Sequence, residues 1–159
     1  MAIATLLPTI GKPAPDFTLP STTGEPISLK QFKGKKSVVL YFYPKDETPG
    51  CTKEACAFRD LAAEFDRLGV AILGVSTDPM DSHLKFRDKL QLPFPLLTDE
   101  DAAVSRAYGV YKQKNLYGKK YLGIERTTFI VDRTGRTAQI YPKVKVEGHI
   151  QDLLEFLGD

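Results

Sequence analysis

The sequence has few of the residues that cross-link small proteins or bind metal ions. Its 159 residues include two cysteines and two histidines. Two cysteines in a chain of this length do not form a disulfide scaffold. His83 and His149 lie far apart and form no metal-binding spacing with the cysteines. A zinc site and a protease with a Cys–His pair are therefore both disfavoured.

The chain also lacks a strong net charge, a long apolar run and a glycine loop for phosphate. A formal net charge of +2 is too small to indicate nucleic acid or an anionic membrane as a partner. The longest apolar run is far shorter than a membrane span. Residues 1–10 have neither the basic segment nor the hydrophobic core of a secretory signal. We therefore expect a cytoplasmic protein whose residues 1–159 form a single domain.

The clearest pattern in the sequence runs through residues 38–68. Residues 38–43 are all apolar or aromatic, which is typical of a strand covered on both faces. The segment 44–50 contains two prolines and a glycine and interrupts regular structure. Apolar residues then recur at helical spacing, namely Phe58, Leu61, Ala62, Phe65 and Leu68. The pattern predicts a strand, a loop and one long amphipathic helix that is closed by Gly69.

Cys51 stands at the point where this loop becomes the helix. The first turn of a helix has unpaired N–H groups, and its dipole favours a negative charge there. Both effects favour the ionised form of a thiol and make the sulfur reactive. Cys51 is therefore a candidate nucleophile, although an isolated cysteine is more often a small apolar filler.

The remaining sequence predicts an α/β domain. Residues 1–15 are expected to form a loose lead-in, and residues 110–125 show no clear periodicity. The other expected elements are short strands at 17–19 and 27–29, a helical turn at 29–32, a strand at 70–75, a helix from 78 to about 90, a strand at 96–97, a helix from 99 to about 108, strands at 127–131 and 137–141 joined by a tight turn, and a last amphipathic helix that carries Ile150, Leu153, Leu154 and Leu157. The strand–helix–strand order predicts a parallel centre with antiparallel strands on one side. We expect a thioredoxin-like fold, with a central mixed β-sheet flanked by helices and an N-terminal hairpin extension.

Residues 44–51 read PKDETPGC, which is a proline, three residues, a threonine, two residues and a cysteine. This pattern closely resembles the active-site motif of the peroxiredoxins. The continuation TKEAC places a second cysteine five positions further on and resembles the bacterioferritin-comigratory, or Q-type, subfamily. Further stretches match in the same order along nearly the whole chain: PAPDFTLP from residue 13, GVSTD from 74, LPFPLLTD from 92 and GIERTTFIVD from 123.

The resemblance implies roles for five residues. Cys51 would be the peroxidatic cysteine and Cys56 the resolving one, with Thr48 and Arg126 as partners of the sulfur and Pro44 as a shield over the site. It implies a thiol peroxidase for hydrogen peroxide and organic hydroperoxides, with no metal or organic cofactor, recycled by thioredoxin or a similar dithiol. We expect a monomer, because an intrachain resolving cysteine needs no second subunit, and we expect no nucleic-acid or membrane partner.

The spacing of the two cysteines carries a separate prediction. On an ideal helix, five residues separate two Cα atoms by about 8.6 Å and turn the side chains ~140° apart. A disulfide needs a Cα separation below about 7 Å. The Cys51–Cys56 bond therefore cannot close while this turn is helical. We predict that residues 52–57 unwind after Cys51 is oxidised.

Simpler interpretations of the same residues remain open. Thr48 could be a turn or capping residue, Arg126 a surface ion-pair partner and Cys56 a passive filler. His83 is expected on a helix face and His149 at the start of the last helix. The acidic residues 99–101 suggest helix capping more than metal binding.

The lysines and tyrosines of residues 111–121 favour a solvated loop near the site over a nucleic-acid patch.

Two other functions fit the same sequence. A disulfide reductase on the same fold is one alternative, to be distinguished by whether peroxide or a protein disulfide oxidises Cys51 faster. A redox-sensing or holdase-like protein is another, to be distinguished by whether it turns over more than one equivalent of peroxide.

Overall fold

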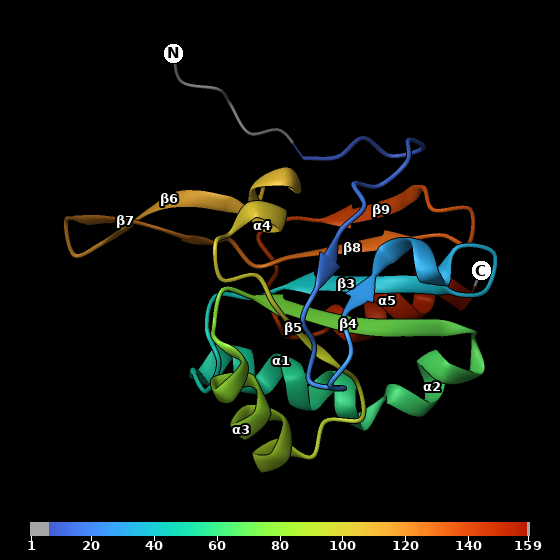
Figure 1. The fold of residues 1–159 in the computed structure, drawn as a ribbon, viewed down its shortest axis with the longest axis horizontal. Coiled ribbons are helices and arrows are strands. Elements are labelled where there is room, and N and C mark those ends of the chain that lie inside the picture. Colours follow the sequence, from blue (N-terminus) through green and yellow to red (C-terminus); the bar gives the residue numbers. More distant parts are fainter. Residues whose placement is uncertain (1–6, 159) are drawn as a thin grey trace.

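A five-stranded mixed sheet forms the centre of the computed structural model, which describes residues 7–158. The strands lie in the order β5-β4-β3-β8-β9 (Figure 1). Their bounds are Leu96–Thr98 for β5, Val70–Ser76 for β4, Ser37–Phe42 for β3, Thr127–Val131 for β8 and Thr137–Tyr141 for β9. β3, β4 and β5 are parallel, whereas β8 is antiparallel to both of its neighbours. The predicted thioredoxin-like fold is thus confirmed.

Each face of this sheet packs on its own apolar cluster. Alternate side chains of β3 face opposite sides, so that Val39 and Tyr41 join one cluster and Val38 and Leu40 the other. The first face is covered by α1 (Pro49–Asp60), α2 (Ala62–Arg67), α3 (Met80–Leu90) and α5 (His149–Gly158). The second face is covered by β1 (Thr18–Leu19), β2 (Ile27–Ser28), η1 (Leu29–Phe32) and the segment around α4 (Ala103–Ala107). Burial on both sides explains why β3 is a continuous apolar run.

The long helix predicted after Cys51 is divided into α1 and α2. Leu61 separates them with φ −113° and ψ 12°, and its N–H bonds the carbonyl three residues back instead of four. Across this break, Phe58 of α1 and Phe65 of α2 pack with ring centroids 5.8 Å apart in the same apolar cluster. Gly69 follows α2 at φ +74°, as expected of a residue that ends a helix.

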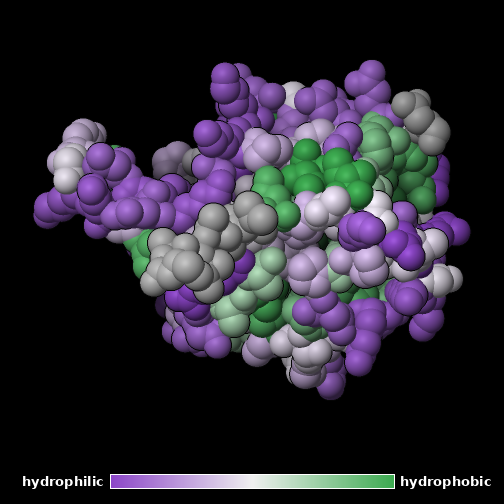
Figure 2. Space-filling model, turned by 90° about the horizontal axis from the view of Figure 1, so that it is seen from above, coloured by the Kyte–Doolittle hydropathy of each residue, from purple (hydrophilic) through white to green (hydrophobic). Residues whose placement is uncertain are grey.

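Residues 110–125 form an antiparallel hairpin that the sequence did not predict. β6 (Tyr111–Leu116) pairs with β7 (Lys119–Ile124) outside the main sheet. Figures 1 and 2 show it projecting from the body as a largely hydrophilic finger. Tyr117, at its tip, is 97% exposed. Because most of the hairpin buries neither face, its sequence shows no apolar alternation.

Residues 7–15 of the N-terminal lead-in are hydrogen-bonded to the segment between β8 and β9 and to β9 itself, so the expectation of a loose segment was wrong for these residues. Gly11 and Ala14 donate backbone hydrogen bonds to the carbonyls of Thr137 and Gly135. Residues 1–6 of the lead-in lie outside the described part of the chain. Between residues 7 and 158, every helix is too short or too polar to cross a membrane.

Candidate active site

Cys51 is the third residue of α1, directly after the loop that leaves the carboxyl end of β3. Thr48 is the N-cap residue, and Pro49 begins the helix with a fixed φ and no N–H to satisfy. The Cys51 side chain is 1% exposed and belongs to the apolar cluster under the sheet. Cys56 is half-buried in the same helix, and both thiols are free. The turn between the two cysteines is helical, which is the geometry that prevents a disulfide.

Arg126 reaches Cys51 from the segment between β7 and β8. Its Nη2 atom donates to Cys51 Sγ at 3.3 Å, and its Nη1 donates to Glu54 Oε1 at 2.6 Å. A Cβ atom on Gly50 would lie 3.0 Å from Nη2. Glycine at this position therefore permits the close approach of the guanidinium. Arg126 is not a surface ion-pair partner, because its side chain is only 16% exposed.

Glu54 is the partner of Arg126 that the sequence analysis missed. It is fully buried, and burial raises its pKa to about 7 although the nearby Arg126 charge acts in the opposite direction. Its Oε2 atom has no hydrogen-bond partner among the described residues. A signal was present, because residues three apart share a helix face. Glu54 therefore follows Cys51 onto the buried face, where a carboxylate needs a cation.

Two further groups lie in the electric field of this cluster. Burial lowers the pKa of Lys114 on the hairpin; the Arg126 charge lowers it further, and Cys51 opposes the shift. Burial raises the pKa of Tyr41 well above its usual value, with Glu54 and Cys51 adding to the shift. The reactive sulfur thus lies near two cationic side chains, one in contact and one on the hairpin.

Thr48 and Pro44 lie on the loop that leads to Cys51. The Thr48 hydroxyl donates to the Lys45 carbonyl at 2.8 Å and makes no capping bond to α1. Because its proton is used in this bond, the oxygen is left to accept a hydrogen bond from another molecule. Pro44 is half-buried where the chain leaves β3. These two positions are consistent with the predicted roles but do not test them.

The two histidines lie on helices, and both are buried. His149 begins α5, as expected; burial lowers its pKa to about 4, and its Nε2 lies 2.8 Å from the Thr128 hydroxyl. His83 was expected on a helix face but is fully buried against Asp46. Asp46, Asp78 and His83 form the one group of described residues whose ligand atoms lie close enough to hold a metal ion.

Two of the acidic residues 99–101, Asp99 and Asp101, cap α4, as the sequence suggested. Asp99 accepts the N–H groups of Val104 and Ser105 through its two oxygens, and Asp101 accepts that of Ala103. These bonds satisfy the first N–H groups of the helix. The carboxylates are therefore used for structure.

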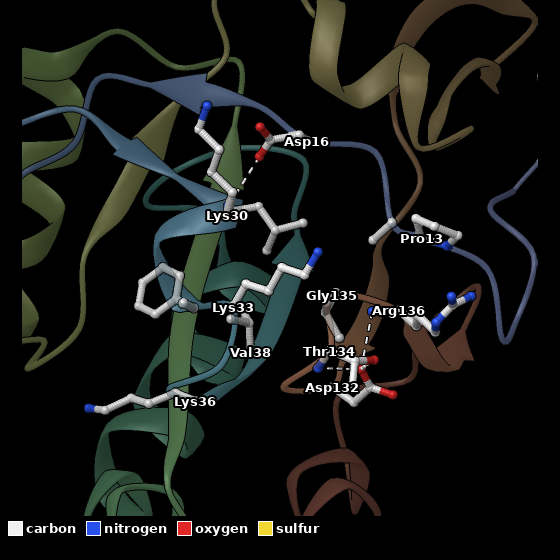
Figure 3. Close-up of a pocket in the computed structure, with 14 residues that line it drawn as sticks. Pro13, Asp16, Lys30, Lys33, Lys36, Val38, Asp132, Thr134, Gly135 and Arg136 are labelled. Carbon is white, nitrogen blue, oxygen red and sulfur yellow. Dashed lines mark hydrogen bonds between the residues drawn. The ribbon is translucent and has the colours of Figure 1, made fainter.

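A cavity of about 220 Å³ lies at the opposite end of the sheet from Cys51. It is bounded by the start of β3 at Val38 and the turn around Gly135, which joins β8 to β9. Figure 3 shows Lys30, Lys36 and Arg136 extending away from its centre. Lys33, by contrast, extends across the cavity toward Gly135 (Figure 3). The cavity contains neither cysteine.

Comparison with known proteins agrees with this geometry. The sequence model of the AhpC/TSA family matches residues 10–140. A putative peroxiredoxin bcp of Coxiella burnetii is 53% identical over 145 residues, which is 91% of this chain and 95% of the relative. Peroxiredoxin Bcp of Bacillus subtilis is 48% identical over 94% of this chain and 95% of its own length.

Solved structures give the same answer for the fold. Peroxiredoxin Q of Xanthomonas campestris superposes with a TM-score of 0.84 at 46% identity and covers 89% of both chains. A PrxQ mutant of Xylella fastidiosa superposes with a TM-score of 0.89 at 35% identity, over 95% of this chain and 96% of that one. A further Xanthomonas campestris structure is described in terms of the alkyl peroxide reduction activity of bacterioferritin comigratory protein.

A thioredoxin-like sheet with a thiol at a helix start, held against a guanidinium, is the arrangement of a thiol-dependent peroxidase. The family match and the relatives agree with this class over almost the whole chain. The chain belongs to the AhpC/TSA family, as a peroxiredoxin of the bacterioferritin-comigratory, or Q, type.

Proposed function

We propose that this peroxiredoxin reduces hydrogen peroxide and small organic hydroperoxides through a Cys51 sulfenic acid and then a Cys51–Cys56 disulfide. The observation that carries the proposal is the 3.3 Å contact between Arg126 Nη2 and Cys51 Sγ at the start of α1. Support for organic substrates comes from the Xanthomonas campestris relative, whose structure is described by its alkyl peroxide reduction activity.

In the first step the Cys51 thiolate attacks the terminal oxygen of the hydroperoxide. The S–O bond forms as the O–O bond breaks, and the departing oxygen takes a proton and leaves as water or an alcohol. The thiolate is thereby oxidised to a sulfenic acid. Arg126 can stabilise both the thiolate and the charge on the departing oxygen, and Thr48 can accept a hydrogen bond from the hydroperoxide.

Ionisation of the thiol accounts for only part of such a rate. A free thiol with a pKa of about 8.5 is roughly 3% ionised at pH 7, so complete ionisation gains about 30-fold, or ~2 kcal/mol. Removing one donor that faces the charge in the transition state typically costs about 10²–10³-fold. We therefore assign the larger contribution to Arg126 and the loop donors, not to ionisation alone.

In the second step Cys56 attacks the Cys51 sulfur, releases water and forms the disulfide. Both cysteines lie within α1, so residues 52–57 must first unwind. Glu54 lies between them and is held by Arg126 at 2.6 Å. Unwinding therefore also separates this buried ion pair, which links the chemistry of Cys51 to the stability of the turn.

The cycle closes when an external dithiol reduces the disulfide. Thioredoxin or a similar protein is proposed for this step on the basis of the family. We further propose that residues 1–159 form a single domain, and that the protein acts as a cytoplasmic monomer without a metal or organic cofactor. The intrachain position of Cys56 supports the monomer, because resolution needs no second subunit.

Peroxide consumption by the wild type, Cys51→Ser and Cys56→Ser tests the proposal, with intact-mass analysis of the oxidised proteins. Cys51→Ser should be inactive. Cys56→Ser should consume one equivalent and accumulate a sulfenic acid or its over-oxidised products, whereas the wild type should accumulate a disulfide. Turnover by Cys51→Ser would contradict the assignment of the nucleophile. Oxidised wild type that contains no Cys51–Cys56 disulfide would contradict the role of Cys56.

A further inference from the structure

A buried hydrogen-bonded cluster lies behind the loop that carries Thr48. His83 of α3 is fully buried, and its Nδ1 lies 2.7 Å from Asp46 Oδ2. Its Nε2 lies 3.0 Å from the carbonyl oxygen of Leu97 in β5. The ring thus spans the space between the loop before α1 and a strand of the sheet.

The partners of this ring fix its protons. A carbonyl oxygen can only accept, so His83 Nε2 carries a proton. Asp46 accepts from the Tyr43 hydroxyl at 2.6 Å through Oδ1 and from the Ser82 hydroxyl at 2.8 Å through Oδ2. Short bonds from two hydroxyls favour an ionised carboxylate. The 2.7 Å contact is then an Nδ1–H donor to a carboxylate, and both ring nitrogens act as donors.

This arrangement fits a structural cluster better than a cation site. The ligand atoms of Asp46, Asp78 and His83 lie within 4.8 Å of one another. However, Asp78 Oδ2 already accepts from the Ser76 hydroxyl at 2.6 Å and from the Asp46 N–H at 2.8 Å. A ring with a proton on each nitrogen has no lone pair for a metal. The cluster therefore binds α3 and the end of β4 to the loop.

Asp46 is the residue through which this cluster reaches the active site. The carbonyl of the preceding Lys45 accepts the Thr48 hydroxyl at 2.8 Å. The following Glu47 has φ +62°, a left-handed conformation that is uncommon for a side chain of this kind. Such a conformation persists when its neighbours are held firmly. Asp46 supplies that hold through its side chain and its N–H.

We propose that His83 and Asp46 are positioning residues that hold the loop before α1. In this position the Thr48 hydroxyl donates to the Lys45 carbonyl, and its oxygen is free to accept a hydrogen bond from the hydroperoxide. The inference rests on the proposed function, because it concerns the step in which Cys51 is oxidised. It gives α3 an indirect part in catalysis: His83 acts through the loop that carries Thr48 and makes no contact with the sulfur.

Two isosteric substitutions separate this role from simple filling of space. His83→Asn keeps a donor where Nδ1 meets Asp46, and His83→Gln keeps one where Nε2 meets Leu97. Each variant loses one buried hydrogen bond. We expect single-turnover oxidation of Cys51 by hydrogen peroxide to slow by about 10-fold or more in His83→Gln, and to stay within about 3-fold of the wild type in His83→Asn. Denaturant unfolding of both variants checks that their stabilities match.

Nitrogen-15 spectra of the wild-type histidine rings provide a readout that needs no variant. We expect both ring nitrogens of His83 to show hydrogen-bonded protons, as their contacts with Asp46 and Leu97 imply. An unprotonated Nδ1, or equal oxidation rates in the Asn and Gln variants, would overturn the proposal. Failure of the proposed function would instead appear as hydroperoxide turnover by Cys51→Ser, an outcome that the His83 variants do not influence.

Discussion

The two ends of the central sheet use charge in opposite ways. At the Cys51 end, Arg126 and Glu54 are withdrawn from solvent and bonded to each other, and Arg126 also donates to the sulfur. At the other end, Lys36 and Arg136 border a cavity of about 220 Å³ but extend away from its centre (Figure 3). At the reactive end the thiol itself is only 1% exposed.

This difference shows that convergence of charge, and not the size of a hollow, marks the functional end. A buried ion pair costs desolvation energy that its mutual attraction repays only with good geometry. Exposed cations that point into water cost little and contribute little. The fold therefore keeps a costly arrangement at the Cys51 end, where it serves the chemistry of the thiolate.

The largest expected effect compares one arginine from each end. In Arg126→Ala, the buried Glu54 carboxyl loses its cation and its hydrogen bond, and its pKa rises further because the Arg126 charge no longer lowers it. We expect a loss of about 3–5 kcal/mol in the free energy of unfolding. Arg136→Ala removes an exposed side chain and one exposed hydrogen bond to the Gly11 carbonyl, and should change stability by no more than about 1 kcal/mol. Chemical denaturation of the reduced proteins measures both, and equal losses would contradict the distinction between the two ends.

The next effect concerns the pH dependence of stability. Burial raises the pKa of Glu54 in the folded protein from 4.5 to about 7. The protonated Glu54 therefore contributes to the free energy of unfolding fully below pH 4.5, and this contribution is lost as the pH rises through 7. This change corresponds to about 3 kcal/mol. Glu54→Gln removes the titration, and its stability relative to the wild type should improve by that order between pH 4.5 and pH 8. Subtracting the free energies of unfolding of the two proteins at each pH cancels the titration of the other groups, including His149. A difference that does not change with pH would refute the assignment to Glu54.

A smaller effect tests the space above Gly50. A methyl group there would lie 3.0 Å from Arg126 Nη2 and push the guanidinium away from the sulfur. We expect Gly50→Ala to slow Cys51 oxidation by about 10-fold, since small displacements of aligned groups are costly. Gly158→Ala is the matched control, because nothing lies within 4 Å of its position. Unchanged kinetics in Gly50→Ala would show that the close approach of Arg126 is not required.

Local patterns in the sequence predicted the sheet and the setting of Cys51. The apolar run of β3 and the prolines of the loop are short-range signals that gave the correct strand and loop, and the spacing of Phe58 and Phe65 gave the helical conformation but one helix in place of two. The break at Leu61 was not predicted, because residues 58–65 contain neither the proline nor the glycine that usually marks the end of a helix. The hairpin of residues 111–124 was not visible because it buries little.

The partners within the site were harder to predict than its nucleophile. Arg126 was named from the family motif, but its bond to Glu54 joins residues far apart in the chain. The pairing of Asp46 with His83 likewise depends on the fold, which brings α3 against the loop. Periodicity shows which face of an element is buried, but it does not show which polar groups meet there.

The most direct test of the account is the rate of Cys51 oxidation per ionised thiol. The fraction of thiolate, followed by its ultraviolet absorbance, and the single-turnover rate with hydrogen peroxide should be measured for the wild type, Arg126→Ala and Thr48→Val. The account predicts that Arg126→Ala remains about 100-fold slower after correction for ionisation, with a loss in the same direction for Thr48→Val. Corrected rates that coincide with the wild type would contradict it.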